Sequence, residues 1–179
     1  MKRTLLLIGA ILVVAGLVVG FLVFKPWLLF VDVRVDDALP TITQPTELPT
    51  PDPTATAAPE PAGPIVLASG TLTSHEHETS GTVSIVEQSD GSRVLAIAGL
   101  DTSNGPDVHV WLSASDVVEG FDGWFVAGGA PYLDLGLIKG NLGDQVYEIP
   151  ADADLTQYRS VVLWCAQFSV SFGAAQLSP

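Results

Sequence analysis

Apolar side chains fill the segment Leu5–Phe24 without interruption, and no charged residue stands within those twenty positions. A helix of this length rises about 30 Å, which matches the hydrocarbon core of a bilayer. A cleavable signal peptide has a shorter apolar region of about 7–15 residues, followed by a site with small residues. The run here is longer, and no Ala-x-Ala site follows it. The pattern therefore predicts an uncleaved transmembrane helix that contacts membrane lipid.

Charged residues on the two sides of this segment predict its orientation. Lys2 and Arg3 precede it, whereas Asp32, Asp36 and Asp37 follow it. Basic residues stay preferentially on the cytoplasmic side of a membrane. We therefore expect a single-pass protein of the cell membrane with a cytoplasmic N-terminus. The rest of the chain is then extracellular or periplasmic.

Proline and threonine dominate the next segment, Pro40–Pro64, which contains eight prolines and six threonines in 25 residues. Such a composition can neither form a backbone hydrogen-bond ladder nor bury a core. Pro-rich linkers act as semi-rigid spacers of about 3 Å per residue. The chain therefore divides into a membrane anchor with short flanks at 1–35, a stalk at 36–64 and a domain at 65–179. We expect the stalk to hold the domain away from the bilayer.

Within the domain, short runs rich in β-branched and aromatic residues alternate with turn signals. Ser89–Ser92 reads as the turn of a β-hairpin. No segment of useful length has a helical period, although Asp152–Tyr158 is expected to form one helical turn. The runs expected as strands are Gly70–Thr73, Gly81–Glu87, Arg93–Ala98, Asp107–Ser113, Tyr132–Ile138, Gln145–Ile149, Ser160–Cys165 and Phe168–Phe172.

Alternation within these runs indicates a sheet with one buried face. Val108, Val110 and Leu112 share one face of their strand, and His109 and Trp111 share the other. About eight strands at this spacing favour an all-β domain, an antiparallel β-sandwich or a barrel-like sheet. A domain of about 115 residues can bury a sufficient core by itself.

Charge excludes one class of partner. From Ile65 onward the sequence has three basic and fourteen acidic residues, so the domain has a net charge of 3 − 14 = −11. Such a surface repels a phosphate backbone, and we expect no nucleic-acid partner. A solvated, soluble surface explains the acidity better than a cation-binding role does.

Enzyme signatures are missing from the sequence. It has no G-x-S-x-G, H-E-x-x-H, P-loop or Rossmann fingerprint. A non-enzymatic redox or binding module is therefore favoured over an enzyme.

The single cysteine, Cys165, is the strongest candidate for chemistry. Because no second cysteine is present, its redox reactions must be intermolecular, through a mixed disulfide or a sulfenic acid. The thiol ends a predicted strand, where a partner can reach it. The alternative is a small buried residue on the face of Val161 and Leu163. No basic residue or histidine lies within five positions, so any lowering of the thiol pKa must come from a group folded nearby, such as His109.

Three histidines are weaker candidates, as metal ligands. His109 can be paired with Cys165, because imidazole and thiolate suit copper, zinc and haem iron. A hydrogen-bonded histidine on a half-buried strand is the favoured alternative. His75 and His77 place two imidazoles on one side of an extended segment, but two ligands do not make a site. We favour a polar strand edge there, and expect the purified protein to be colourless, without a cofactor or stoichiometric metal.

Several stretches of the domain together resemble a known family, the DM-thirteen domain. This electron-transfer DM domain accompanies DOMON domains in animals. The resemblance covers about Ser69–Leu177, and His77–Gly81 fits the opening H-x-x-S-G pattern of the family. The stretches that carry it are Gly105–Leu112, Leu135–Gln145, Val162–Cys165, Phe168 and Phe172–Ala175.

The resemblance implies a β-sandwich-like fold and a characteristic cysteine near the C-terminus, which corresponds to Cys165. It also implies an electron-transfer role based on that cysteine. Our first hypothesis is a membrane-tethered, extracytoplasmic redox domain with a protein partner. The second is a non-catalytic binding or adhesion module displayed on a stalk, and the third is a metal- or haem-binding domain that uses His109 with Cys165. Accessibility of the thiol distinguishes the first two.

Overall fold

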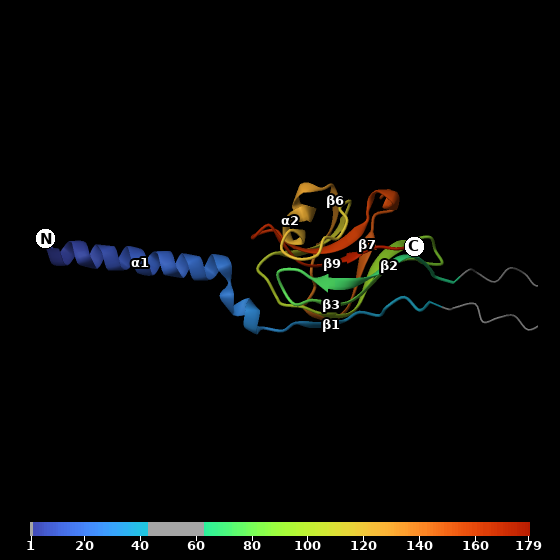
Figure 1. Cartoon of the computed structure of the whole chain (residues 1–179). Helices are drawn as coiled ribbons and strands as arrows, with labels where there is room; N and C mark the ends of the chain where they lie inside the picture. Colours follow the sequence, from blue (N-terminus) through green and yellow to red (C-terminus); the bar gives the residue numbers. More distant parts are fainter. Residues whose placement is uncertain (1, 43–62) are drawn as a thin grey trace, which may run out of the picture.

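The computed structural model describes residues 2–42 and 63–179 (Figure 1). Most of the predicted stalk, residues 43–62, therefore lies outside the described residues. The first element is helix α1, Lys2–Phe24, which confirms the predicted apolar helix. It is long and apolar enough to cross a bilayer, a property that N-terminal signal sequences share. A short 3₁₀ helix, η1 (Pro26–Phe30), follows it.

The domain is mainly β, as expected. Its short helical elements are α2 (Gly123–Val126), η2 (Ala127–Gly129) and η3 (Leu155–Gln157), and η3 confirms the helical turn predicted within Asp152–Tyr158. The strands are β1 (Arg34–Asp36), β2 (Ile65–Ser74), β3 (Ser80–Glu87), β4 (Arg93–Asp101), β5 (Val108–Ser113), β6 (Tyr132–Leu137), β7 (Leu142–Ile149), β8 (Ser160–Cys165) and β9 (Val170–Gln176).

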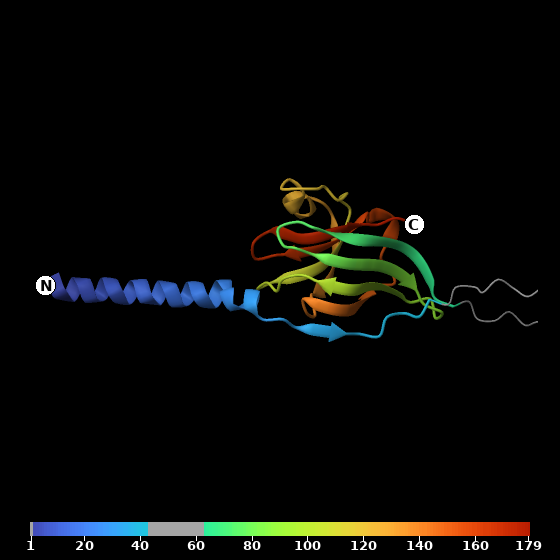
Figure 2. The same ribbon diagram turned by 60° about the horizontal axis from the view of Figure 1, so that its bottom comes forward.

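All nine strands belong to one sheet in the order β1-β7-β4-β3-β2-β9-β8-β5-β6, which curls into a half-barrel (Figure 2). Every neighbouring pair is antiparallel except β1 and β7, which are parallel. The predicted all-β, barrel-like class is confirmed. The parallel pair arises because β1 reaches the sheet from α1 and not through a hairpin turn.

The main core lies on the inner face of the curled sheet. Val108 and Val110 of β5 stand opposite Cys165 and Leu163 of β8, and all four side chains are buried in one cluster with Leu112. This is the face that the alternation in β5 predicted, because successive strand residues point to opposite sides of a sheet.

A smaller core lies on the outer face of the same strands. Trp111 and Trp164 stack at 5.0 Å between ring centroids, and Tyr132 stacks on Trp111 at 3.7 Å. Ala127 packs against this cluster. At the neighbouring Gly128, an added Cβ would lie 2.7 Å from the Trp164 ring, so the glycine lets this short helical segment rest on the indole.

Strand β1 attaches the segment after α1 to the domain, which the sequence did not predict. Arg34, Val35 and Asp36 stand opposite residues 142–144 of β7. The expected boundary between anchor and stalk, at residue 35, falls inside this strand. Lys139 forms an ion pair with Asp37 directly after it.

The buried amide of Asn141 reinforces this attachment. Its Nδ2 donates to Asp32 Oδ1 and to the carbonyl oxygen of Thr102, both at 2.9 Å. Its Oδ1 accepts the backbone N–H of Val33 at 2.7 Å. One side chain thus joins the segment before β1 to the loop after β4.

As a result, α1 ends beside the domain. Residues 42 and 63, which flank the segment that is not described, lie at the opposite end of the sheet (Figures 1 and 2). The described residues between α1 and the sheet therefore do not hold the domain away from the helix. The domain stands next to the end of the helix, and the expected spacer role of the stalk stays a prediction, because most of the stalk lies outside the described residues.

Candidate functional site

Cys165 is the last residue of β8, and its side chain is completely buried. It stands opposite Val108 on one side and Val170 on the other. The expectation that a partner can reach this thiol at the strand end is wrong for this conformation. The alternation that buries Val161 and Leu163 continues to the final position of the strand.

Burial also raises the pKa of the Cys165 thiol above its ordinary value. The backbone N–H groups of Phe168, Asp107 and Gln167 interact with the sulfur and act in the opposite direction. The negative charge of Asp107 adds to the increase. The thiol is therefore protonated at neutral pH, and formation of the reactive thiolate requires exposure to water.

The residues that follow Cys165 connect it to α1. We call Ala166–Ser169, the turn between β8 and β9, the β8–β9 tip. Gln167 Nε2 donates to the carbonyl oxygen of Val23 at 3.0 Å. The ring of Phe168 stacks on that of Phe24, with centroids 5.9 Å apart. The tip above the thiol thus touches the end of the apolar helix.

Ser169 gives the β8–β9 tip a strained backbone. Its φ of 54° lies in the left-handed region, which costs a non-glycine residue about 1 kcal/mol or more. A strained turn that covers a buried reactive group is a suitable place for local opening.

His109 lies on the other side of the sheet from Cys165. It stands opposite Trp164, the neighbour of the cysteine, so the two side chains point to opposite faces. His109 and Cys165 therefore do not meet as ligands, and the favoured alternative, a hydrogen-bonded histidine on a half-buried strand, matches the geometry. His109 Nδ1 lies 2.8 Å from Asp134 Oδ2 without an aligned hydrogen bond, and Nε2 lies 3.2 Å from Asp107 Oδ1.

His75 and His77 follow the end of β2, in a bend and not on a strand edge. His75 Nδ1 forms a 2.8 Å hydrogen bond with Ser171 Oγ. His77 Nε2 lies 2.7 Å from a carboxylate oxygen of Glu76, and its ring packs on Phe172 at 3.9 Å between centroids. The two imidazoles therefore have different partners. Within residues 2–42 and 63–179, no group of three or more His, Cys, Asp or Glu side chains is arranged to hold a metal ion.

We expect His75 and His77 to make the stability of the folded protein depend on pH. Burial lowers the pKa of His75 and of His77 below the ordinary value of 6.5. When the pH falls below 6.5, the unfolded chain binds protons that the folded chain does not, so stability decreases until the lowered pKa values are reached. We expect the Tm to fall between about pH 7.5 and 5.5, and the double variant His75→Gln, His77→Gln to show a smaller fall. Thermal melts across this range would measure it.

Carboxylates do not contribute to the change of the Tm in this pH range. Asp37, Asp90 and Asp154, the carboxylates whose pKa values are shifted, have pKa values below the ordinary 3.8. They lose their stabilising effect only at lower pH. An equal fall of the Tm in the wild type and in the double variant would contradict the assignment to the histidines.

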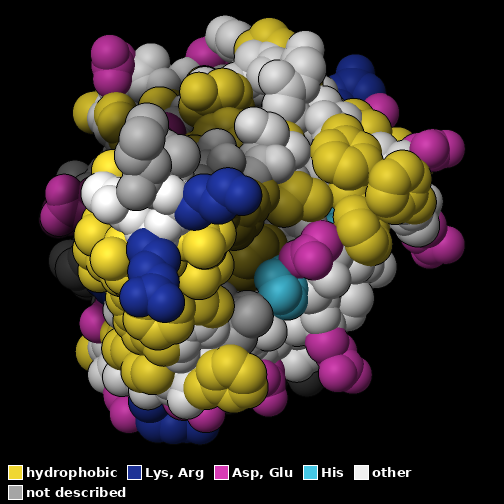
Figure 3. All heavy atoms as spheres, turned by 90° about the vertical axis from the view of Figure 1, so that its left-hand side faces the viewer, with side chains coloured by type: hydrophobic (Ala, Val, Ile, Leu, Met, Phe, Trp, Pro, Cys, Tyr) yellow, Lys and Arg dark blue, Asp and Glu magenta, His cyan; other side chains and the backbone are white. Residues whose placement is uncertain are grey.

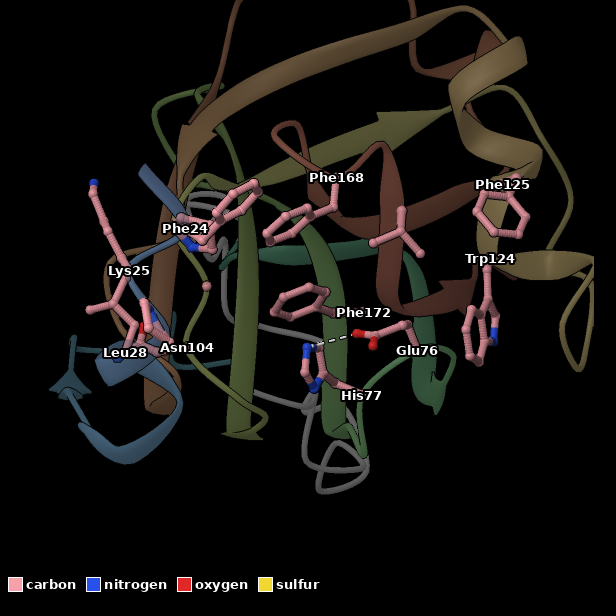
Figure 4. A pocket seen from close by; sticks show the side chains of 14 residues that line it. Phe24, Lys25, Leu28, Glu76, His77, Asn104, Trp124, Phe125, Phe168 and Phe172 are labelled. Atoms are coloured by element: carbon pink, nitrogen blue, oxygen red, sulfur yellow. Dashed lines mark ion pairs between the residues drawn. The ribbon is translucent and has the colours of Figure 1, made fainter. Parts of the chain in front are cut away.

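A pocket of about 420 Å³ lies between the end of α1 and the domain (Figure 4). The sequence analysis did not find it, because its walls come from five separate segments of the chain. We call it the α1 pocket. Rings form much of its lining, and a polar pair, Glu76 and His77, lies at one side. Its walls include Phe24, Lys25, Trp124, Phe125, Phe168 and Phe172.

The surface around this pocket is apolar. Figure 3 shows hydrophobic side chains around a hollow on the face toward α1, with a histidine and an acidic side chain at its edge. Phe121, Phe125 and Phe168 keep 65%, 46% and 47% of their surface exposed. Exposed aromatic groups of this density mark an interaction surface. The aromatic residues within Phe121–Phe125 are a sequence signal that could have indicated it.

Comparison with known proteins gives one match. A family model described as electron transfer DM13 matches residues 71–177, a range that extends from β2 to the end of β9 and includes Cys165. No curated protein and no solved structure matches the chain.

Proposed function

The chain belongs to the electron transfer DM13 family, and we propose that it is a membrane-tethered redox domain that acts through Cys165. In this proposal α1 crosses the cell membrane with its N-terminus in the cytoplasm. The domain lies on the extracellular or periplasmic side, where it exchanges electrons with a protein partner.

The properties of α1 support the tether. Its 23 residues correspond to a length of about 35 Å. Leucine, valine and isoleucine side chains are exposed along its length, which is unfavourable in water and favourable in lipid. Trp27, directly after the helix, packs on Phe21 at 4.8 Å between ring centroids and suits the interfacial zone of a bilayer. Lys2 and Arg3 favour a cytoplasmic N-terminus.

The observation that carries the redox role is the position of the thiol beneath the β8–β9 tip. Cys165 is the single cysteine of the chain, it is completely buried, and the turn that directly follows it contains a strained residue, Ser169. The backbone N–H of Asp107, which lies outside the tip, interacts with the sulfur and can stabilise a thiolate once the tip opens. Opening of the tip therefore converts an inert thiol into a reactive one.

The reaction follows from the presence of one thiol. After the tip opens, the thiolate of Cys165 attacks a disulfide of the partner. A sulfur–sulfur bond forms between Cys165 and one partner sulfur, and the other partner sulfur leaves as a thiolate. The electrons balance within this exchange, because the partner disulfide is the oxidant. A thiolate of a second partner then attacks the first partner's sulfur in the mixed disulfide, so that a disulfide forms between the two partners and Cys165 leaves as a thiolate.

Labelling of the thiol tests this proposal. We expect the full chain in detergent to react slowly with a maleimide, and the variant Phe168→Ala to react about fivefold faster. Removal of the ring that stacks on Phe24 lowers the free energy of local opening by about 1 kcal/mol. Cys165→Ser should give no mixed disulfide with a small disulfide reagent, whereas the wild type forms one per chain. Mass spectrometry measures both products.

Asp90→Ala serves as the matched control. Asp90 Oδ1 accepts the backbone N–H of Ser92 at 2.9 Å in the turn between β3 and β4, so this variant loosens a turn that does not cover the cysteine. Its labelling rate should equal that of the wild type. If all forms react only after global denaturation, Cys165 is a core residue and the redox proposal fails.

A binding module is the second candidate function, and the α1 pocket is the observation that favours it. The pocket and the exposed aromatic side chains around it offer a ligand surface that requires no chemistry at Cys165. If the α1 pocket binds a ligand in a chain whose Cys165 is unreactive, that result would support this second candidate alone.

A further inference from the structure

The α1 pocket opens at the level where the apolar helix ends. Phe24, the last residue of α1, and Lys25 form part of its wall. Asn104 Nδ2 donates to the carbonyl oxygen of Val31 at 2.7 Å and fixes the segment after η1 against the same loop that lines the pocket. If α1 spans the bilayer, the pocket lies at the membrane surface, and a lipid-dissolved molecule reaches it without crossing water.

The walls of the pocket suit a planar, mostly apolar ligand. Trp124 and Phe125 lie on one side and Phe168 on another, with Phe172 between Phe168 and His77 (Figure 4). Aromatic side chains stack favourably on a flat ring. A volume of about 420 Å³ falls within the usual range for a small-molecule site.

A polar pair, Glu76 and His77, lies at one side of the α1 pocket and offers hydrogen-bonding groups. His77 Nε2 lies 2.7 Å from Glu76 Oε2, and the imidazole rests on Phe172. An imidazole can donate a hydrogen bond to a carbonyl oxygen or accept one from a hydroxyl group. The pair therefore recognises a ligand that carries oxygen on an otherwise apolar ring.

We propose that the α1 pocket binds a membrane-soluble quinone, with the ring between the aromatic side chains and one ring oxygen at His77. This assignment rests on the redox function proposed above, because that function selects a quinone among lipid-soluble molecules with a polar head. The apolar tail extends along Phe24 toward the lipid.

The pocket also adjoins the cover of the redox thiol. Phe168 forms part of its wall, and the backbone N–H of the same residue interacts with the sulfur of Cys165. Pro106 lines the pocket and precedes Asp107, whose N–H also interacts with the sulfur. When the partner brings a thiol in place of a disulfide, the quinone is the oxidant: joining the thiols of Cys165 and the partner in a disulfide releases two electrons and two protons, and reduction of the quinone to a quinol consumes them. The two reactions therefore balance.

Titration calorimetry of the full chain in detergent tests the binding. The probe is a benzoquinone with a decyl tail, and decanol is the control for the tail alone. We expect one quinone per chain and weaker binding by about tenfold in His77→Leu, which loses the polar contact but keeps an apolar side chain of similar size. Phe125→Ala should weaken binding to a similar degree.

Phe121→Ala is the matched control for Phe125→Ala. The two rings are 5.2 Å apart and both are exposed, but among them only Phe125 lines the pocket. Phe121→Ala should bind the quinone as the wild type does. Decanol that binds equally well, together with an unchanged affinity in His77→Leu, would reveal an unspecific acyl-chain site and overturn the proposal. Absence of quinone binding would overturn it as well.

The variant Cys165→Ser separates this proposal from the redox function. It should retain full quinone affinity, because the sulfur lies outside the pocket lining. Quinone binding with an unreactive cysteine would contradict the redox function alone. A reactive cysteine in a chain that binds no quinone would contradict the pocket assignment alone.

Discussion

Replacement of Phe172 by alanine is expected to lower the free energy of unfolding by about 3–5 kcal/mol. The Phe172 side chain is only 2% exposed and belongs to the main core, where it meets His77 from the bend after β2. Its removal deletes apolar contacts and leaves a cavity that the curled sheet cannot close, because β9 is paired on both sides. Denaturant unfolding of the full chain in detergent measures the loss.

Phe168→Ala is the matched control for this prediction. Both rings line the α1 pocket, but Phe168 is 47% exposed and lies on the β8–β9 tip. We expect a loss below about 1 kcal/mol for this variant, since exposed side chains contribute little to global stability. Equal losses in the two variants would mean that the tip is part of the cooperative core. Local opening above Cys165 would then be as costly as global unfolding.

Replacement of Asn141 by leucine should destabilise the protein by about 2–5 kcal/mol and release the segment before β1. The side chain is 2% exposed and holds Asp32, Val33 and Thr102 through three hydrogen bonds. Leucine has a similar size but leaves a backbone N–H and a carbonyl group without partners, at a cost of about 1–3 kcal/mol each. Hydrogen exchange at the N–H of Val33 and a thermal melt together measure the effect.

Asn104→Leu provides the comparison, because Asn104 makes an exposed hydrogen bond to the segment that follows α1. We expect it to cost less than about 1 kcal/mol. If Asn141→Leu melts like the wild type while exchange at Val33 stays slow, the amide is not what holds the segment before β1 to the sheet.

Local sequence patterns were sufficient for the elements and for the faces of the strands. The uncharged run Leu5–Phe24 forms α1, and the alternation around Val108 and His109 correctly predicted which of them enters the core. These features repeat with the period of a helix or a strand, so neighbouring residues carry the whole signal. The motifs that resembled the DM-thirteen domain are likewise local, and the family match over residues 71–177 confirms them.

No such local pattern marks β1. Arg34–Asp36 is short and charged, and its pairing depends on residues 142–144, more than 100 positions away. The reason becomes visible only in the fold, at Gly143. Its φ is +92°, and an added Cβ would lie 2.1 Å from the carbonyl oxygen of Val35. A glycine thus makes room for the backbone of β1, and nothing near it in sequence indicates this.

Cys165 also shows the difference between what the sequence determined and what only the tertiary structure decided. Because only one thiol is present, the sequence determined that any redox chemistry at Cys165 must be intermolecular, and the alternation placed it on the face of Val161 and Leu163. Tertiary structure decided that the thiol is completely buried, that His109 lies on the opposite face and that α1 ends beside the β8–β9 tip. Burial, pKa and access depend on which distant segments pack together. The free energy of the whole fold determines which segments pack together, and no periodic pattern in the sequence indicates it.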